Sequence, residues 1–309
     1  MKKCSTILID ERYDTSNTSL LSFDFEAGTN NSVEERLGKC SIKNGTIDEK
    51  KLYLIDDFFS PQEGLELRDL SKSLSFSRKS YGSPEAIEKG EKPAKSMNGK
   101  ERWLFFSNPP QAIKQLHEFF KFLAYRLDAV ITTLPWELCD QTGTSSPCTI
   151  ANFIEEASSE SMLLGKHQDS NPEGKIAFGI PKLYAQKEEY HPSQFVNGSE
   201  GNPWIVSVML YATDENFNPE YQLGTAFYDF EGDLKFRANC SHMRIVLFEG
   251  DIFHTIEESK IPPGLKTWRV SYVYKLVINP RKEKQCLKAE FDKLFSKTDE
   301  LVLGSNERD

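Results

Sequence analysis

The segment from Thr149 to Ile278 constrains the fold most, because it reads as a series of short strands separated by turns. Runs of β-branched and aromatic residues alternate with turns that contain Gly, Asn or Asp, as in all-β sandwiches and barrels. We expect strands at Thr149–Ile154, Met162–Lys166, Ile205–Tyr211, Thr225–Phe230, Arg244–Phe248, Ile252–Thr255 and Arg269–Ile278. So many short strands in sequence predict two packed sheets or a closed barrel.

Helices are expected before these strands. A strand-like run, Lys51–Phe59, leads into Ser60-Pro61-Gln62-Glu63, which carries a serine cap, a proline at the first helical position and a glutamate three residues after the cap. Pro109-Pro110 opens a second helix, whose apolar stripe continues to Leu134 and on which His117 is expected to be a core or flanking histidine. The order of elements predicts a mainly β protein with flanking helices, with helical support over 60–135 and a strand core over 148–279.

The remaining segments are polar. Residues 1–49 are expected to form a loosely ordered arm and residues 77–101 a loop. Residues 286–309 form a charged tail, which overlaps a helix-like stretch from Glu283 to Phe295. The insert 181–203 is long, polar and aromatic, which is typical of a lid over a site. The main domain is therefore expected over 50–285.

Charge and cysteine usage exclude several classes of protein. Lys and Arg number 38 against 47 Asp and Glu, for a net charge of −9, so a phosphate-binding basic face is not expected. No apolar run approaches the ~18 residues of a membrane span, and the first residues lack the apolar core of a signal peptide. Six scattered cysteines form no CxxC pair. We expect a cytoplasmic protein without nucleic-acid or membrane partners, and the sequence leaves the oligomeric state open.

Four residues of metal-ligand or anion-binding type lie at strand ends. His167 and Asp169 close one strand, His254 follows 85 residues after Asp169, and Arg269 opens the last strand 15 residues later. A His and an Asp two positions apart on an extended strand point to the same side, and a neighbouring strand can bring the second His to them. Each residue alone has an ordinary structural reading; together they indicate a metal site.

Two imidazoles and one carboxylate on one face of an ion form the facial triad of non-haem Fe(II) enzymes, with three positions left open. Zinc also accepts such a set, so a zinc hydrolase on a cupin-like barrel remains an alternative, as does a binding protein whose metal is purely structural. Arg269 favours the iron reading, because its planar fork suits a carboxylate held by two hydrogen bonds.

With these residues the sequence resembles the Fe(II)/2-oxoglutarate-dependent dioxygenases, over roughly residues 50 to 280. That family carries His-x-Asp, a distant His, and then an Arg or Lys for the oxoglutarate tail. The runs Val206–Asp214 and Tyr53–Pro61 are similar to its prolyl-hydroxylase-like branch.

The resemblance implies a double-stranded β-helix (jelly roll) core. It implies Fe(II) held by His167, Asp169 and His254, and oxoglutarate paired with Arg269, with Ser271 and Asn152 as further candidate contacts. O2 is the other cosubstrate, and ascorbate is a candidate stimulant. The implied reaction is hydroxylation of an unactivated C–H bond, coupled to conversion of oxoglutarate into succinate and CO2. The implied substrate is an amino acid, free or within a peptide or protein; another small metabolite remains an alternative.

Overall fold

Strands make up most of the elements in the chain, as the sequence predicts. The computed structural model describes residues 23–25, 27–74, 77–78, 95–96, 109–133, 152–157, 166–171, 176–177, 196–282, 284–295 and 299–301. Within these residues, no helix combines the length and the apolar character needed to cross a bilayer.

A large sheet of eleven strands forms the centre of the fold, in the order β16-β2-β3-β13-β10-β15-β7-β5-β4, with β6 pairing with β15 and β1. Neighbouring strands within this sheet run antiparallel, except β16 and β2, which run parallel. Its strands are β1 Phe23–Phe25, β2 Ser41–Ile47, β3 Lys50–Asp56, β4 Ser77–Arg78, β5 Lys95–Ser96, β6 Ala129–Thr133, β7 Asn152–Ala157, β10 Trp204–Thr213, β13 Ile245–Glu249, β15 Arg269–Pro280 and β16 Asp299–Glu300.

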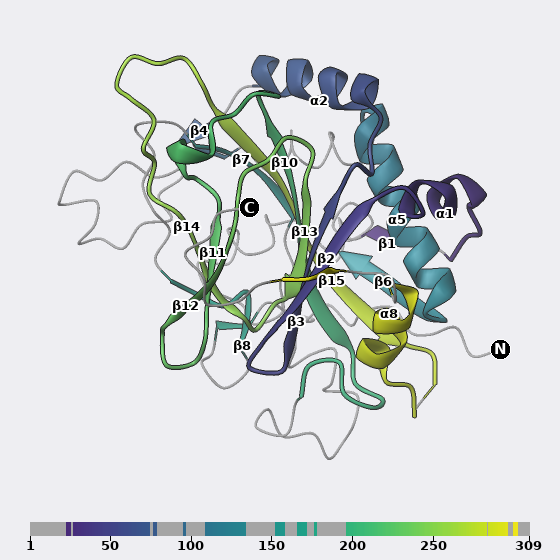
Figure 1. The fold of residues 1–309 in the computed structure, drawn as a ribbon. Coiled ribbons are helices and arrows are strands. Elements are labelled where there is room, and N and C mark those ends of the chain that lie inside the picture. Colours follow the sequence, from purple (N-terminus) through teal and green to yellow (C-terminus); the bar gives the residue numbers. More distant parts are fainter. Residues whose placement is uncertain are drawn as a thin grey trace, which may run out of the picture.

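A second sheet of three strands, in the order β12-β11-β14, faces one side of the large sheet, and β8 and β9 form a separate pair. Both sheets contribute apolar residues to the layer between them, for example Phe227 on β11 and Val273 on β15. Figure 1 shows β11, β12 and β14 on one side of the large sheet, with the helices along the other. The remaining elements are β8 Ser170–Asn171, β9 Ile176–Ala177, β11 Thr225–Tyr228, β12 Leu234–Ala238, β14 Phe253–Ile256, α1 Asn31–Leu37, α2 Pro61–Ser73, α5 Gln111–Arg126, α8 Leu287–Leu294 and the short 3-10 helix Pro219–Tyr221.

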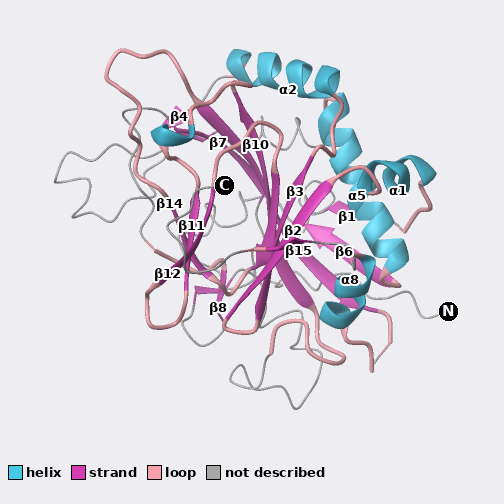
Figure 2. Ribbon diagram, viewed as in Figure 1, coloured by secondary structure: helices cyan, strands magenta, loops and turns pink. Residues whose placement is uncertain are grey.

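The helices cover the other face of the large sheet (Figure 2). On β15, residues 270, 272, 274, 276 and 278 lie in the same apolar cluster as Leu67 of α2, Leu116 of α5 and Phe291 of α8. His117 is part of this layer: its Nε2 lies 2.8 Å from the Tyr274 hydroxyl, and burial lowers its pKa to about 4. The prediction of a core or flanking histidine is confirmed. The two-sheet arrangement agrees with a mainly β fold, whereas the double-stranded β-helix stays a prediction.

Three expectations need correction. The arm 1–49 is not loosely ordered over residues 31–47, which form α1 and β2; Arg36 on α1 holds Glu63 of α2 through contacts of 2.8 and 3.0 Å, and β2 pairs with β3 over its whole length. The second helix ends at Arg126 rather than Leu134, because Asp128 takes a positive φ of 46° and the β-branched residues after it pair with β15. The predicted loop 77–101 contains the short strands β4 and β5.

Two expected features lie wholly or largely outside the described residues: the strand Met162–Lys166, of which only Lys166 is described, and residues 181–195 of the insert. The end of the insert, 196–203, is described and is anchored to the fold. Asn197 is buried, and its side chain bonds the backbone N–H and C=O of Ile205 at 2.7 and 3.0 Å.

Candidate metal and anion site

The structure brings His167, Asp169 and His254 together at the edge of the three-stranded sheet. His254 lies on β14, and His167 pairs with it as an isolated antiparallel bridge with backbone N–H···O distances of 2.9 and 2.8 Å. Gln168, between the two ligand-type residues, donates from Nε2 to the carbonyl of Asp251 at 2.6 Å. His167 and His254, which are far apart in the sequence, thereby lie side by side, as the sequence predicts.

The side chains of these three residues offer one ligand atom each, all within 4.8 Å of one another. Asp169 Oδ1 lies 3.7 Å from His167 Nε2, and Asp169 Oδ2 lies 3.5 Å from His254 Nε2. These separations are close to those needed to place all three atoms on one face of a first-row metal ion. The side chains of Asp169 and His254 are almost fully buried, whereas the His167 side chain is 31% exposed, so solvent reaches the cluster from the His167 side.

The protonation states suit metal binding. Burial lowers the pKa of His254 to about 3, so its imidazole is neutral at neutral pH and has a lone pair to offer. Its Nδ1 lies 2.9 Å from the Ile252 carbonyl, which assigns the proton to Nδ1 and leaves Nε2 free to face Asp169. Burial opposes ionisation of Asp169, but Lys275, His254 and His167 outweigh it and hold the pKa of that carboxyl well below its usual range.

Two residues that the sequence analysis did not single out complete the surroundings of Asp169. Ser207 on β10 donates from Oγ to Oδ2 at 2.5 Å, and the ammonium of Lys275 on β15 contacts the same oxygen. Both side chains are buried, and the two residues face each other in the β10–β15 register. The strand pattern contains a signal for Lys275: polar residues occupy positions 269, 271 and 275, while Val270, Tyr272 and Tyr274 are apolar or aromatic.

Arg269 opens β15 and is fully buried. Its three guanidinium nitrogens have no hydrogen-bond partner within the described part of the chain, and neither does the hydroxyl of Ser271. The guanidinium carbon lies 5.0 Å from the centre of the Tyr211 ring, and the Tyr211 hydroxyl lies 2.6 Å from Thr225 Oγ1. A buried cation without an acceptor is costly, so this pocket is suited to an anion.

Strand alternation places this pocket and the His–Asp cluster in one space. Side chains two residues apart on a strand point to the same side. On β15, Val273 packs between the two sheets, so Arg269, Ser271 and Lys275 project there as well. The sheet therefore supplies a row of two cations and a hydroxyl that faces the three-stranded sheet carrying His254.

The remaining predicted site residue, Asn152, lies on β7 and pairs with Tyr274 in the β7–β15 register. Its contact with oxoglutarate stays a prediction.

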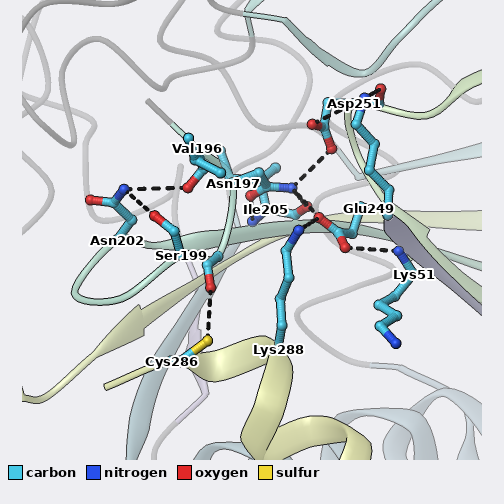
Figure 3. A network of polar contacts seen from close by, with 12 residues as sticks. Lys51, Val196, Asn197, Ser199, Asn202, Ile205, Glu249, Asp251, Cys286 and Lys288 are labelled. Atoms are coloured by element: carbon cyan, nitrogen blue, oxygen red, sulfur yellow. Dashed lines mark hydrogen bonds and ion pairs between the residues drawn. The ribbon is translucent and has the colours of Figure 1, made fainter. Parts of the chain in front are cut away.

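A buried polar network supports the loop before His254 (Figure 3). Asn197 Nδ2 lies 3.2 Å from Glu249 Oε2 and 3.1 Å from Asp251 Oδ1, while Lys288 of α8 lies 2.7 Å from Glu249 Oε2. Because Asp251 also accepts from Gln168, the network connects α8 and the end of the insert to the backbone between His167 and Asp169.

No protein-family model and no curated protein sequence matches the chain. Among solved structures, it is similar to a prolyl hydroxylase from Trichoplax adhaerens in complex with a hypoxia inducible factor peptide fragment. The identity is 15%, the match covers 82% of this chain and 90% of that one, and the TM-score is 0.41. It is also similar to a prolyl-4-hydroxylase from Pseudomonas putida, at 10% identity over 81% of this chain and 98% of that one, with a TM-score of 0.35. At such values the function has to be argued from the site itself.

Proposed function

We propose that the protein is an Fe(II)- and 2-oxoglutarate-dependent dioxygenase that hydroxylates an unactivated C–H bond. The observation that carries this proposal is the combination of two features in one inter-sheet space. His167, Asp169 and His254 offer converging ligand atoms, and the buried guanidinium of Arg269 lacks an acceptor among the described residues. A metal site alone fits many reactions, whereas a metal site beside a carboxylate-binding cation fits a cosubstrate with two acidic ends.

The donor set fits the metal. His167, Asp169 and His254 would hold Fe(II) through two nitrogens and one oxygen, leaving positions for a chelating 2-oxoacid and O2. When bound, the iron supplies the O2 chemistry that couples oxidation of the oxoacid to oxidation of the substrate. Arg269 binds the distal carboxylate through two hydrogen bonds, and Ser271, whose hydroxyl also lacks a partner among the described residues, adds a third. The apolar residues between the sheets exclude water around these groups.

For the substrate we propose an amino acid, either free or in a peptide or protein. This class rests on the resemblance of the sequence to the prolyl-hydroxylase-like branch. Another small metabolite is the alternative within the same reaction.

A second candidate is a non-catalytic protein in which the cluster has a structural role. The contact between Lys275 and Asp169 favours it, because the ammonium balances the buried carboxylate without any metal. The two candidates differ in their response to iron and oxoglutarate.

The test is a turnover assay on metal-depleted full-length protein. Succinate release is measured after addition of Fe(II), oxoglutarate and ascorbate, with Zn(II) in place of Fe(II) as the control metal and with candidate amino acids and peptides added in turn. We expect one metal ion per chain and succinate release that needs both Fe(II) and oxoglutarate. Stoichiometric metal without succinate under any condition would support the non-catalytic candidate, and zinc in the protein as isolated, with no response to oxoglutarate, would support a hydrolase.

A further inference from the structure

Lys275 stands out because a lysine is rarely buried, and here it lies beside a candidate metal ligand. Its side chain is 5% exposed, and its ammonium contacts Asp169 Oδ2 directly and lies 3.3 Å from Ser207 Oγ. A buried charge of this kind needs a compensating function or a compensating partner. Asp169 is that partner, and it is the same carboxylate that the proposed metal would use.

The hydrogen bonds of Asp169 divide its two oxygens by role. Oδ2 accepts from both Ser207 and Lys275, which is the number of donors that its two lone pairs can serve. Oδ2 also lies 3.5 Å from His254 Nε2, but its lone pairs are used, whereas Oδ1, 3.7 Å from His167 Nε2, is left to coordinate a metal. Asp169 would then bind through one oxygen, and Lys275 would stay in contact with the other when the metal is present.

The positive charge of Lys275 affects the binding of the metal and of the oxoacid in opposite directions. With neutral imidazoles, Asp169, Lys275 and Arg269 sum to +1, so a divalent ion brings the site to +3 and a doubly charged oxoacid returns it to +1. Without the lysine the same steps run from 0 to +2 and back to 0. Lys275 therefore weakens binding of the metal ion alone and strengthens binding of the anion. Both effects are strong where water is excluded.

We propose that Lys275 couples the two binding events, so that the metal is held weakly on its own and tightly together with a dianionic 2-oxoacid. This inference rests on the proposed function and adds to it a positioning residue with a specific effect. Coupling is reciprocal: the factor by which the oxoacid strengthens metal binding equals the factor by which the metal strengthens oxoacid binding.

The experiment is a calorimetric titration of metal-depleted protein with Mn(II), which probes the site without turnover, in the absence and presence of saturating oxoglutarate. The ratio of the two dissociation constants is the coupling factor. It is measured for the wild type, Lys275→Met, Lys275→Arg and Ser207→Ala, and for Lys266→Met as an exposed lysine control. Circular dichroism checks the fold, and Lys275→Gln replaces Lys275→Met if the latter does not fold.

We expect the coupling factor of Lys275→Met to fall by about tenfold or more, because the repulsion of the bare metal and the attraction of the anion are lost together. Lys275→Arg keeps the charge and should keep most of the coupling. Ser207→Ala loses a donor to the same oxygen without a change in charge, so it should weaken Mn(II) similarly with and without oxoglutarate, by about 10- to 100-fold.

An unchanged coupling factor in Lys275→Met, whatever its affinity for Mn(II), would overturn the inference and leave the proposed function standing. A wild-type protein that binds no Mn(II) with or without oxoglutarate would overturn both. The two failures are therefore distinguishable in one set of titrations.

Discussion

Individual residues of the site were predictable where their chemistry is specific. The spacing of His167, Asp169 and His254 predicts a shared metal face, and the structure places their ligand atoms within 4.8 Å of one another. Lys275 and Ser207 escaped prediction because a lysine or serine in a strand usually faces water, and only their register across β10 and β15 brings them to Asp169. The strand pattern likewise does not show that Asn152 pairs with Tyr274.

The Asp169–Lys275 pair predicts a non-additive effect on stability. Asp169→Ala leaves a buried ammonium without its carboxylate, and breaking such a pair costs about 3–5 kcal/mol. Adding Lys275→Met to that variant removes the stranded charge and should recover part of the loss. Chemical unfolding of the two single variants, the double variant and the wild type, all metal-free, measures the coupling; additive losses would show that the two charges do not stabilise one another.

A milder change at Asp169, to asparagine, tests its role in metal binding. Asp169→Asn keeps the shape of the side chain but removes the charge that offsets a divalent ion, so metal content after desalting should fall steeply. Glu258→Gln, an exposed carboxylate that follows β14, is the matched control and should retain the metal. Equal metal content in the two variants would show that Asp169 is not a metal ligand.

At the scale of single elements, local sequence signals predicted where a helix begins better than where it ends. The helix after Ser60 begins where the sequence indicates, with Ser60 and Glu63 bonding each other's backbone N–H groups in a full capping box. The second helix was predicted too long, because the apolar spacing of a helix continues into β6, a strand buried by its pairing with β15. β12 was not among the expected strands, although its residues Leu234–Ala238 alternate between apolar and polar as in a half-buried strand.

The cap of α2 gives an element-scale prediction. Ser60→Ala removes the acceptor for the Glu63 N–H and should cost about 1 kcal/mol of stability. Because Glu63 also holds Arg36, the same variant should loosen α1, which faster amide hydrogen exchange in residues 31–37 would report. Gln62→Ala, at an exposed neighbouring position, is the control. A stability loss of equal size in both variants would mean that the cap contributes nothing beyond helix propensity.

For the whole molecule, strand content predicted the presence of two layers but not which strands form them. The pairing of β13 with β3 and the parallel contact of β16 with β2 join segments distant in sequence, and no local pattern specifies those partners. The same holds for Glu249. It looks like an ordinary strand end, but the fold buries it among Asn197, Lys288 and the backbone N–H of Lys51 (Figure 3).

Glu249 predicts how stability depends on pH. Burial raises its pKa to about 7, with Lys288 opposing and Asp251 adding to the rise. The folded state therefore binds a proton that the unfolded chain has released, and this group makes stability fall as the pH rises from about 4.5 through 7. Glu249→Gln should flatten the fall, by about 1.4 kcal/mol for each pKa unit of the shift. Unfolding measured from pH 4.5 to 8 checks this, and an unchanged slope would show that Glu249 stays ionised in the fold.

The central claim is that Arg269 holds the distal carboxylate of oxoglutarate beside a metal. The most direct measurement is succinate release against oxoglutarate concentration for the wild type, Arg269→Ala and Arg269→Lys, with Mn(II) binding measured in parallel. Loss of a charged contact with two hydrogen bonds costs about 2–4 kcal/mol, or roughly 30- to 1000-fold in the oxoglutarate requirement.

We predict that Arg269→Ala shows this rise while it still binds the metal, and that Arg269→Lys recovers part of it by keeping the charge without the fork. Monocarboxylic 2-oxoacids, which lack the second acidic end, should lose their disadvantage against oxoglutarate in Arg269→Ala, as judged by CO2 release. An oxoglutarate dependence that is the same in Arg269→Ala and the wild type would contradict the account, because the carboxylate would then be held elsewhere.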